Sequence, residues 1–257
     1  MLFDSHAHLN DARFDEDREA LIKKLQEEHV DLVLNPGADI ETSISSVELA
    51  NKYDFIYAAV GVHPHDVKDL DDTAIDTLRK LATENEKVVA IGEIGLDYYY
   101  DNSPREVQKE WFKKQIELAN ELKLPIIIHD RDAHQDTFEI IKNTKSPEIG
   151  CVLHCYSGNV ELAKEYVKMG YYIGVGGVVT FKNSRVLKEV VKAIPLECIV
   201  VETDCPYLAP APHRGKRNSS AYLPLVIEEI ARLKEITAEE VENVTYENAQ
   251  RLYGLIH

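Results

Sequence analysis

Short apolar runs alternate along the chain with longer stretches in which apolar residues recur at helical spacing. The apolar runs are mostly continuous, which is typical of strands buried on both faces. The pattern predicts strands over residues 2–8, 32–36, 56–61, 88–93, 125–129, 150–154, 172–175 and 198–202. It predicts helices between and after them over residues 19–29, 40–52, 73–85, 105–122, 137–142, 160–169, 183–193 and 223–234.

Eight strand–helix units in this order predict an α/β fold of the (β/α)8 TIM-barrel class and disfavour an open doubly wound sheet. No G-x-G-x-x-G follows the first expected strand, which removes the main sign of a dinucleotide-binding fold. The stretch 237–255 predicts an additional pair of helices, with Thr237 as N-cap and Glu240 completing a capping box. Because no linker or solenoid repeat interrupts the pattern, residues 1–257 are expected to form a single domain.

The charge of the chain restricts the kinds of molecule that it is expected to bind. The net charge of −16 argues against a broad basic face for wrapping duplex nucleic acid. It does not exclude a phosphate-bearing substrate, because bound divalent cations can reverse the potential locally. Nothing in the sequence indicates an obligate protein partner.

The cellular location follows from the apolar segments and the cysteines. Asp4 interrupts the N-terminus where a signal peptide needs an apolar core, and the longest apolar stretches run to about eight residues, far short of a membrane span. We therefore expect a cytoplasmic protein with no membrane association. Its cysteines form no C-x-x-C pair and are expected to be reduced thiols; they are Cys151, Cys155, Cys198 and Cys205.

Histidines and acids fall at the ends of the expected strands: His6, His8, Glu93, His129, His154, Glu202 and Asp204. In a (β/α)8 barrel all these strand ends meet at the rim that carries active sites. Residues i and i+2 of a strand share a face, so His6 and His8 should point the same way, as should Glu202 and Asp204.

A single histidine at a strand end is usually a hydrogen-bonded, half-buried residue, and a single glutamate is usually an ion-pair partner. The convergence of several such residues instead indicates a metal site. Imidazole and carboxylate ligands together suit zinc, manganese or iron, and a carboxylate-rich site also accepts magnesium.

Six motifs follow one another in a specific order. They are D-S-H-A-H-L, G-V-H-P-H, G-E-I-G-L-D-Y, P-I-I-I-H-D-R, H-C-Y-S-G and V-E-T-D-C-P-Y. Each is weak alone, since H-x-H opens many amidohydrolase barrels, but the ordered set resembles the TatD-type metal-dependent deoxyribonucleases. The resemblance runs from Phe3 to the E-N-A-Q-R-L-Y segment near residue 250.

The resemblance implies a division of the ligands between two divalent ions, which could be Mg²⁺, Mn²⁺ or Zn²⁺. One ion would be held by His6, His8, Glu93 and Asp204, and the second by Glu93, His129 and His154, so that Glu93 bridges the two. It also implies a 3′–5′ exonuclease acting on single-stranded or frayed ends of DNA.

The expected mechanism uses metal-activated water. Two cations about 3.5–4 Å apart would lower the pKa of a shared water and hold a phosphoryl oxygen, with Glu93 and Asp204 as the catalytic residues. Asp204 would either accept the proton of that water or serve as a ligand only. Glu202 could be an acid next to the ligands, an extra magnesium ligand or a structural partner.

Several basic and aromatic residues could contact the substrate. His63, Arg131 and the loop 213–217 could bind phosphates, although a solvated loop is the simpler interpretation of 213–217. Arg131 follows His129 by two residues and should face the same side of its strand, unless it pairs with the neighbouring acids Asp130 or Asp132. Tyrosines 98–100 could stack on bases or pack within their loop.

Two other functions remain open from the sequence. The same ions could activate water against a carbonyl carbon, giving a metal-dependent ester or amide hydrolase such as a D-aminoacyl-tRNA deacylase or a lactonase, because the fold does not decide the chemistry. A metal-binding scaffold without activity is disfavoured by the complete ligand set.

Overall fold

The computed structural model describes residues 1–256. Its strands are β1 (Leu2–Asp4), β2 (Val30–Pro36), β3 (Ile56–Val60), β4 (Val88–Asp97), β5 (Ile126–Arg131), β6 (Cys151–Leu153), β7 (Tyr172–Val175) and β8 (Ile199–Val201). Its α-helices are α1 (Arg18–Glu27), α2 (Ile40–Lys52), α3 (Thr73–Glu84), α4 (Arg105–Leu122), α5 (His134–Thr144), α6 (Val160–Lys168), α7 (Arg185–Ala193), α8 (Leu223–Lys234) and α9 (Ala238–Leu252).

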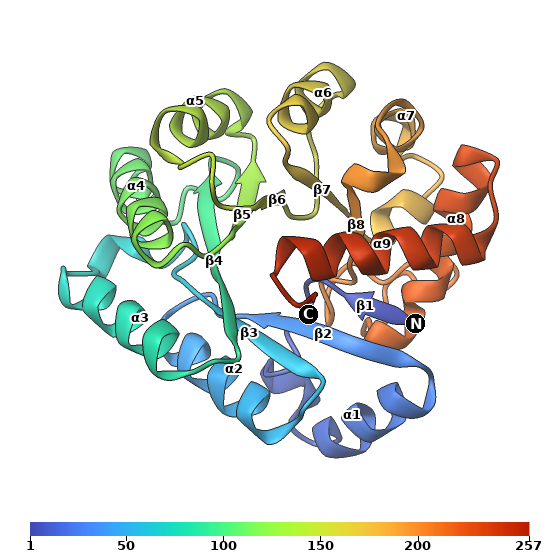
Figure 1. Ribbon diagram of the computed structural model, residues 1–257, viewed down its shortest axis with the longest axis horizontal. Coiled ribbons are helices and arrows are strands. Elements are labelled where there is room, and N and C mark those ends of the chain that lie inside the picture. Colours follow the sequence, from blue (N-terminus) through green and yellow to red (C-terminus); the bar gives the residue numbers. More distant parts are fainter. Residues whose placement is uncertain (257) are drawn as a thin grey trace. The chain divides into compact units, whose positions relative to one another are not determined.

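The order of the strands confirms the predicted fold class. The sheet runs β1-β2-β3-β4-β5-β6-β7-β8, and the pairings described are parallel (Figure 1). Each strand is followed by a helix, as a (β/α)8 barrel requires. The predicted bounds of α2, α4, α8 and β7 agree with the structure at both ends.

Four strands are shorter than predicted, and three are longer; β1, β8 and β4 carry the differences that affect the predicted ligands. β1 ends at Asp4, whose side chain accepts the backbone N–H of His6 at 3.4 Å. β8 likewise ends at Val201, so that His6 and Asp204 lie in the segments that follow the strands. β4 continues four residues past Glu93 to Asp97.

The predicted helix pair over residues 237–255 is wrong. A single helix, α9, covers this stretch, and its N-cap is Thr237 as predicted, with Oγ1 accepting the N–H of Glu240 at 3.1 Å. One continuous helix forms because the buried residues recur along one face of the whole segment; they are Val241, Thr245, Asn248, Ala249 and Leu252.

The chain divides into two compact units. The first unit comprises Met1–Asn35 and Cys155–His257, and the second comprises Pro36–His154. The expectation of a single domain stays a prediction, and the two units are described in turn.

In the first unit, the first and last strands lie side by side, since the N–H of Ser5 donates to the carbonyl of Val201 at 3.1 Å. The α9 segment is fixed to this end of the sheet. Phe3 packs against the rings of Tyr246 and Tyr253 at centroid distances of 6.2 and 5.8 Å, and the Tyr253 hydroxyl donates to the carbonyl of Ser5. Burying such an aromatic contributes about 2–3 kcal/mol of hydrophobic stabilisation.

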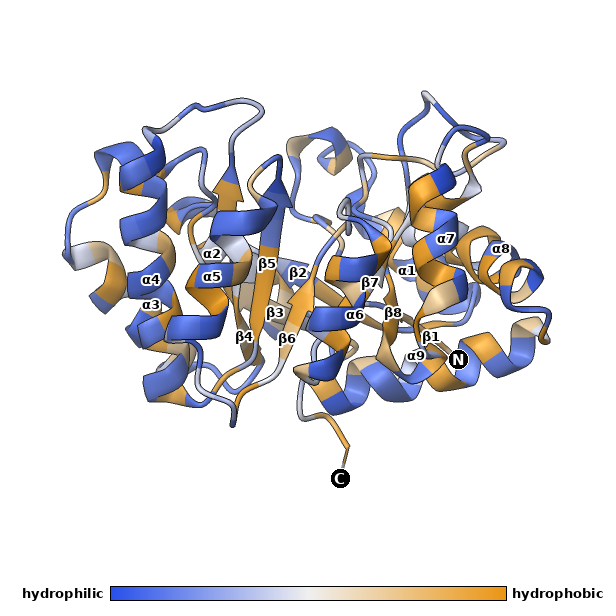
Figure 2. Cartoon of the chain, turned by 90° about the horizontal axis from the view of Figure 1, so that it is seen from above, coloured by the Kyte–Doolittle hydropathy of each residue, from blue (hydrophilic) through white to orange (hydrophobic). Residues whose placement is uncertain are grey.

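In the second unit, α2, α3, α4 and α5 follow one another beside the strands β3 to β5 (Figure 1). β5 is hydrophobic along most of its length and hydrophilic at its carboxyl end (Figure 2). Two buried glutamines of α4 hold the chain segments at the ends of β3 and β4. Gln115 pairs with the N–H and carbonyl of Val62 at 2.7 and 3.0 Å, and Gln108 pairs with those of Asp97 at 2.8 and 3.1 Å.

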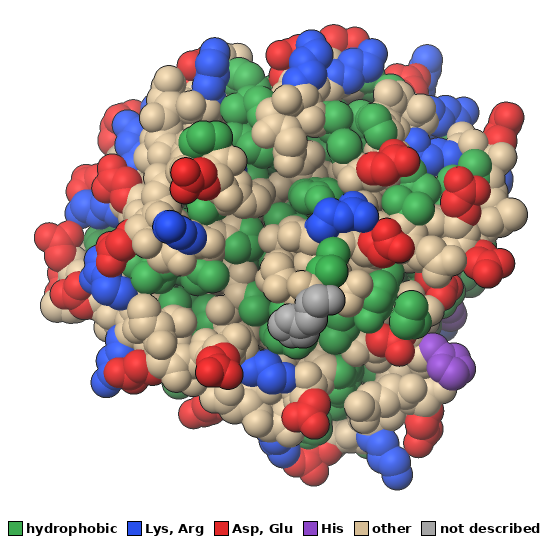
Figure 3. All heavy atoms as spheres, in the orientation of Figure 1, with side chains coloured by type: hydrophobic (Ala, Val, Ile, Leu, Met, Phe, Trp, Pro, Cys, Tyr) green, Lys and Arg blue, Asp and Glu red, His purple; other side chains and the backbone are tan. Residues whose placement is uncertain are grey.

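The surface and the helices give two further findings. No helix within residues 1–256 combines the length and the apolar character needed to cross a membrane. On the face of the molecule drawn in Figure 3, acidic and basic side chains are interspersed.

Candidate metal centre

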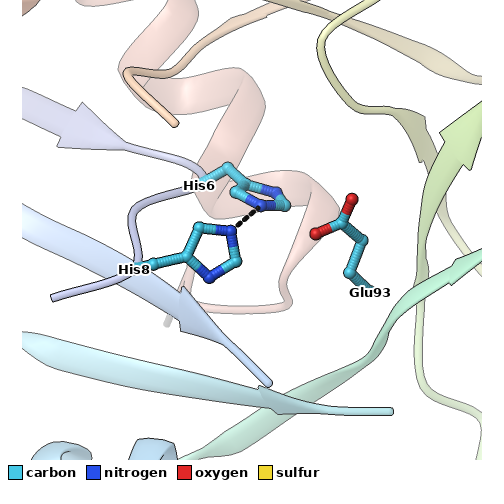
Figure 4. A group of neighbouring side chains, drawn as sticks. All are labelled: His6, His8 and Glu93. Atoms are coloured by element: carbon cyan, nitrogen blue, oxygen red, sulfur yellow. Dashed lines mark hydrogen bonds between the residues drawn. The ribbon is translucent and has the colours of Figure 1, made fainter. Parts of the chain in front are cut away.

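In the first unit, two histidines and one aspartate point to a common place. The Nε2 atoms of His6 and His8 lie 3.1 Å apart (Figure 4, which also draws Glu93 of the second unit). Asp204 Oδ1 lies 3.4 Å from Nε2 of His8 and 3.9 Å from Nε2 of His6. His6 is completely buried. Two ring nitrogens and a carboxylate oxygen at these distances form a donor set that fits a divalent cation.

Backbone hydrogen bonds bring these residues together. The N–H of Asp204 donates to the carbonyl of His6 at 2.9 Å, and the N–H of His8 donates to the carbonyl of Cys205 at 2.8 Å. Asp204 has a φ of 55°, in the left-handed region that aspartate adopts more readily than most residues. The segment after β8 therefore leaves the extended conformation at the residue that carries the carboxylate.

Strand geometry has ended before Asp204, so strand periodicity alone does not place Glu202 and Asp204 on one face. The buried Glu202 side chain instead accepts the N–H of Cys155 through Oε1 at 2.5 Å. A Cβ at Gly174 would collide with this carboxylate, so glycine at that position makes room for it. This contact fits the role of a structural partner, and a carboxylate oxygen of Glu202 also lies within 4.8 Å of a ring nitrogen of the predicted ligand His6.

Asp4 supports this cluster and was not identified from the sequence. Its carboxylate is fully buried and accepts the hydroxyl of Thr203 at 2.5 Å and the N–H of Thr203 at 3.0 Å. Burial raises the pKa of Asp4 to about 6, although these hydrogen bonds oppose the shift. Asp4 thus joins the segment after β1 to the segment after β8.

In the second unit, Glu93 is surrounded by histidine nitrogens. Its Oε1 atom lies 2.8 Å from Nδ1 of His129, 3.7 Å from Nε2 of His63 and 3.8 Å from Nε2 of His154. Glu93 and His154 are buried, and His129 is mostly buried. Two of the predicted ligands, Glu93 and His129, converge here with His63, and one donor atom of each lies within 4.8 Å of the others, an arrangement that fits a divalent cation.

The opposite nitrogen of His129 faces a second carboxylate. Asp97 Oδ2 lies 3.1 Å from Nε2 of His129 and 2.7 Å from Nε2 of His65. Burial alone would lower the pKa of His129, but the hydrogen bonds to Asp97 and Glu93 outweigh it and raise this pKa to about 9. Burial would raise the pKa of Asp97, but its donors hold it below the ordinary value.

His63 presents an N–H to Glu93. The N–H of His65 donates to Nδ1 of His63 at 3.2 Å, so the neutral ring carries its proton on Nε2, the atom nearest Glu93. Burial lowers the pKa of His63 well below its ordinary value, which keeps the ring neutral. His63 is thus a hydrogen-bond donor next to the predicted ligands.

Arg131 does not follow the alternative in which it forms an ion pair with Asp130 or Asp132. Its guanidinium lies over the rings of Tyr99 and Tyr100, 4.0 and 4.7 Å from their centroids. Asp130 pairs with Nδ1 of His134 at 2.9 Å. Tyr99 and Tyr100 are 59% and 54% exposed, so this aromatic–cationic cluster is accessible from solvent.

The tyrosine before this pair is bonded to a neighbouring helix, since the hydroxyl of Tyr98 donates to Asp136 of α5 at 2.6 Å. The basic loop 213–217 of the first unit is also engaged. Arg217 forms two hydrogen bonds to the carboxylate of Asp17, at 2.8 and 2.5 Å. His213 stacks on Tyr222 with centroids 4.1 Å apart. The charge of Arg217 is therefore already partly neutralised by the protein.

Sequence reasoning missed Asp97. It stands in the G-E-I-G-L-D-Y motif, four residues after Glu93, at the last position of β4. The parallel register pairs Asp97 with Arg131 and Gly95 with His129, which brings Asp97 beside the end of β5. A second acid within one motif at a strand end was the only sign available.

A (β/α)8 fold with histidine and carboxylate donors at its strand ends defines the class of metal-dependent hydrolases. Residues 3–254 match the family described as TatD related DNase, and the chain belongs to this family.

Comparisons with individual proteins agree. The chain is 48% identical over 255 residues to YabD, a metal-dependent hydrolase of Bacillus subtilis, covering 99% of this chain and 100% of that protein. It is 38% identical over 257 residues to YcfH, a metal-dependent hydrolase of Escherichia coli K12, covering 99% and 96%. Among solved structures, YjjV, a TatD homologue of Escherichia coli K12, is similar with a TM-score of 0.93, 30% identity and 98% of both chains covered.

Proposed function

We propose that this chain is a divalent-metal-dependent phosphodiesterase that removes nucleotides from the 3′ end of single-stranded or frayed DNA. The observation that carries the proposal is the arrangement at Glu93, where one buried carboxylate oxygen faces the nitrogens of His129, His63 and His154. Membership of a family described as DNases supports the choice of substrate.

The proposed ligands are divided as the resemblance implies. His6, His8, Glu93 and Asp204 hold one ion, and Glu93, His129 and His154 hold the second, with Mg²⁺, Mn²⁺ or Zn²⁺ as the metal. The fold class supports this division, because (β/α)8 enzymes build their sites at the carboxyl ends of the strands. When bound, a pair of such cations supplies an activated water and stabilises charge on a phosphoryl oxygen.

The chain's own residues then have separate tasks. Asp204 Oδ1 accepts the proton of the attacking water, since it is the carboxylate of the first cluster that also retains some solvent exposure. The neutral His63 donates its Nε2–H to a phosphate oxygen. Arg131, stacked on the exposed tyrosines, binds a further phosphate.

The charge of the chain favours a small substrate region. With a net charge of −16, the protein lacks the excess of cations that a long duplex footprint needs. A strand end requires only a few phosphate contacts, and the exposed rings of Tyr99 and Tyr100 suit an unpaired base.

The test compares phosphorus with carbonyl chemistry. Metal-loaded wild type, Glu93→Ala and the exposed control variant Glu86→Ala are incubated with 3′-labelled single-stranded DNA, lactones and D-aminoacyl-tRNA. We expect the wild type and Glu86→Ala to degrade DNA from the labelled end and Glu93→Ala to leave it intact. Rapid carbonyl hydrolysis with inert DNA would replace the proposal with an ester or amide hydrolase.

A further inference from the structure

Asp97 uses both of its carboxylate oxygens on functional neighbours. Oδ2 accepts from Nε2 of His65 at 2.7 Å and from Nε2 of His129 at 3.1 Å. Oδ1 accepts the backbone N–H groups of Tyr99 and Tyr100 at 3.0 and 2.9 Å. A carboxylate has about four acceptor positions, so this fully buried side chain is saturated.

The Oδ2 contact determines how His129 presents its ring. Both ring nitrogens of His129 face carboxylates, which only accept, so Nε2 carries a hydrogen toward Asp97 and Nδ1 carries one toward Glu93. Histidines that bind metals commonly donate their other ring N–H to a carboxylate, which fixes the tautomer and the ring orientation. A cation next to Glu93 would replace the hydrogen on Nδ1, whereas Asp97 would keep the hydrogen on Nε2.

The Oδ1 contacts determine the position of the neighbouring loop. They hold the backbone at Tyr99 and Tyr100, whose exposed rings carry the guanidinium of Arg131. Arg131 is also the register partner of Asp97 across β4 and β5. The accessible aromatic–cationic cluster and the predicted ligand are thus fixed by the two oxygens of one side chain.

Asp97 is itself held in place from the opposite side. Gln108 accepts its N–H and donates to its carbonyl, and the same amide donates to the carbonyl of Ser103 at 2.8 Å. The hydroxyl of Ser103 donates to the carbonyl of His65 at 2.9 Å. These bonds fix the backbone from which the Asp97 carboxylate extends.

We propose that Asp97 is a positioning residue that couples the two parts of the substrate site. One oxygen makes Nδ1 of His129 the metal-binding nitrogen, and the other places Tyr99 and Tyr100 where the terminal base of the DNA strand stacks. The inference rests on the proposed function, because it assigns His129 to a metal and the exposed rings to a nucleic acid.

Metal affinity is the first test. Mn²⁺ binding to protein without DNA is measured by calorimetry for wild type, Asp97→Asn and the control Asp136→Asn, which touches the same loop through the Tyr98 hydroxyl. Asparagine turns its NH₂ toward either the histidines or the loop N–H groups. We expect Asp97→Asn to bind one of the two ions with about 10–100-fold lower affinity and the other with unchanged affinity. Asp136→Asn should bind both ions as the wild type does.

The outcomes separate the two proposals. A wild type that binds no divalent ion overturns the proposed function. A wild type that binds two ions, together with Asp97→Asn that binds both as tightly, overturns the role of Asp97 alone. In the variants that remain active, we also expect Asp97→Asn to raise the KM for single-stranded DNA as much as Tyr99→Ala does. A defect that only destabilised the fold would not reproduce the loss of base stacking on this ring.

A measurement on the wild type keeps the proposal testable if the variants do not fold. Zinc-loaded wild-type protein labelled with ¹⁵N and ¹³C is studied by NMR, and the ring signals of His129 are assigned through their bond correlations to its backbone signals. We expect the proton on Nε2 and the zinc-shifted signal on Nδ1. A proton on Nδ1 with zinc at Nε2 would overturn the inference.

Discussion

Glu93 Oε1 and His129 Nδ1 lie 2.8 Å apart, and both side chains are largely withdrawn from water. This contact joins the carboxylate proposed to bridge two ions to a ligand of one of them. Glu93→Gln keeps the volume of the side chain and removes its charge. We expect metal affinity to fall at least about 100-fold and DNA hydrolysis to be lost, because a buried ligand has become neutral.

Equilibrium dialysis with Mn²⁺, followed by assay on 3′-labelled DNA, measures both effects of Glu93→Gln. The exposed Glu86→Gln is the matched control and should behave as wild type. Full metal content and activity in Glu93→Gln would show that Glu93 is not a ligand.

Asp204→Asn separates proton transfer from metal binding. The amide oxygen can still serve as a ligand, but the residue can no longer accept a proton from water. We expect kcat to fall about 100-fold or more while both ions remain bound. Loss of an ion would assign Asp204 to metal binding alone, and an unchanged kcat would remove it from the catalytic machinery.

Arg131→Ala removes the guanidinium from the rings of Tyr99 and Tyr100. We expect KM for single-stranded DNA to rise about 10-fold, which corresponds to the loss of one charged hydrogen bond. Metal content should not change. Arg105→Ala is a suitable control, since Arg105 lies over Tyr98 on the same loop and pairs with Asp101. Equal KM values for the two variants would exclude a phosphate role for Arg131.

The four cysteines should differ in reactivity. Burial raises the pKa of the Cys151 thiol to about 12, so only about one molecule in 10⁴ carries the thiolate at pH 8. Cys205 is also buried, whereas Cys155 and Cys198 are partly exposed. We expect iodoacetamide to label Cys155 and Cys198 in the native protein and all four thiols after denaturation, as read by mass spectrometry. Rapid native labelling of Cys151 would contradict its burial.

The sequence predicted the fold, and it indicated the proposed ligands, because both predictions rest on local patterns. Continuous apolar runs mark buried parallel strands, and a histidine or acid at the end of such a run is placed by the fold class. His129 and Glu93 could be identified in this way before any distance was known.

Asp97 could not be identified from the sequence, because its role depends on partners far along the chain. His65 and His129 each stand 32 positions from it, and only the folded register brings their Nε2 atoms to one oxygen. The direction of the Asp204 side chain could not be predicted either, since its positive φ depends on bonds to the segment after β1. Side-chain orientation beyond a strand end is a tertiary property that strand periodicity does not determine.

The most direct test of the central claim is anomalous diffraction from crystals equilibrated with Mn²⁺. The account predicts two ions per chain, one bound by His6, His8 and Asp204 and one bound by His129 and His154, with Glu93 a ligand of both at about 2.0–2.3 Å. A single ion, or ions bound elsewhere in an active enzyme, would contradict it.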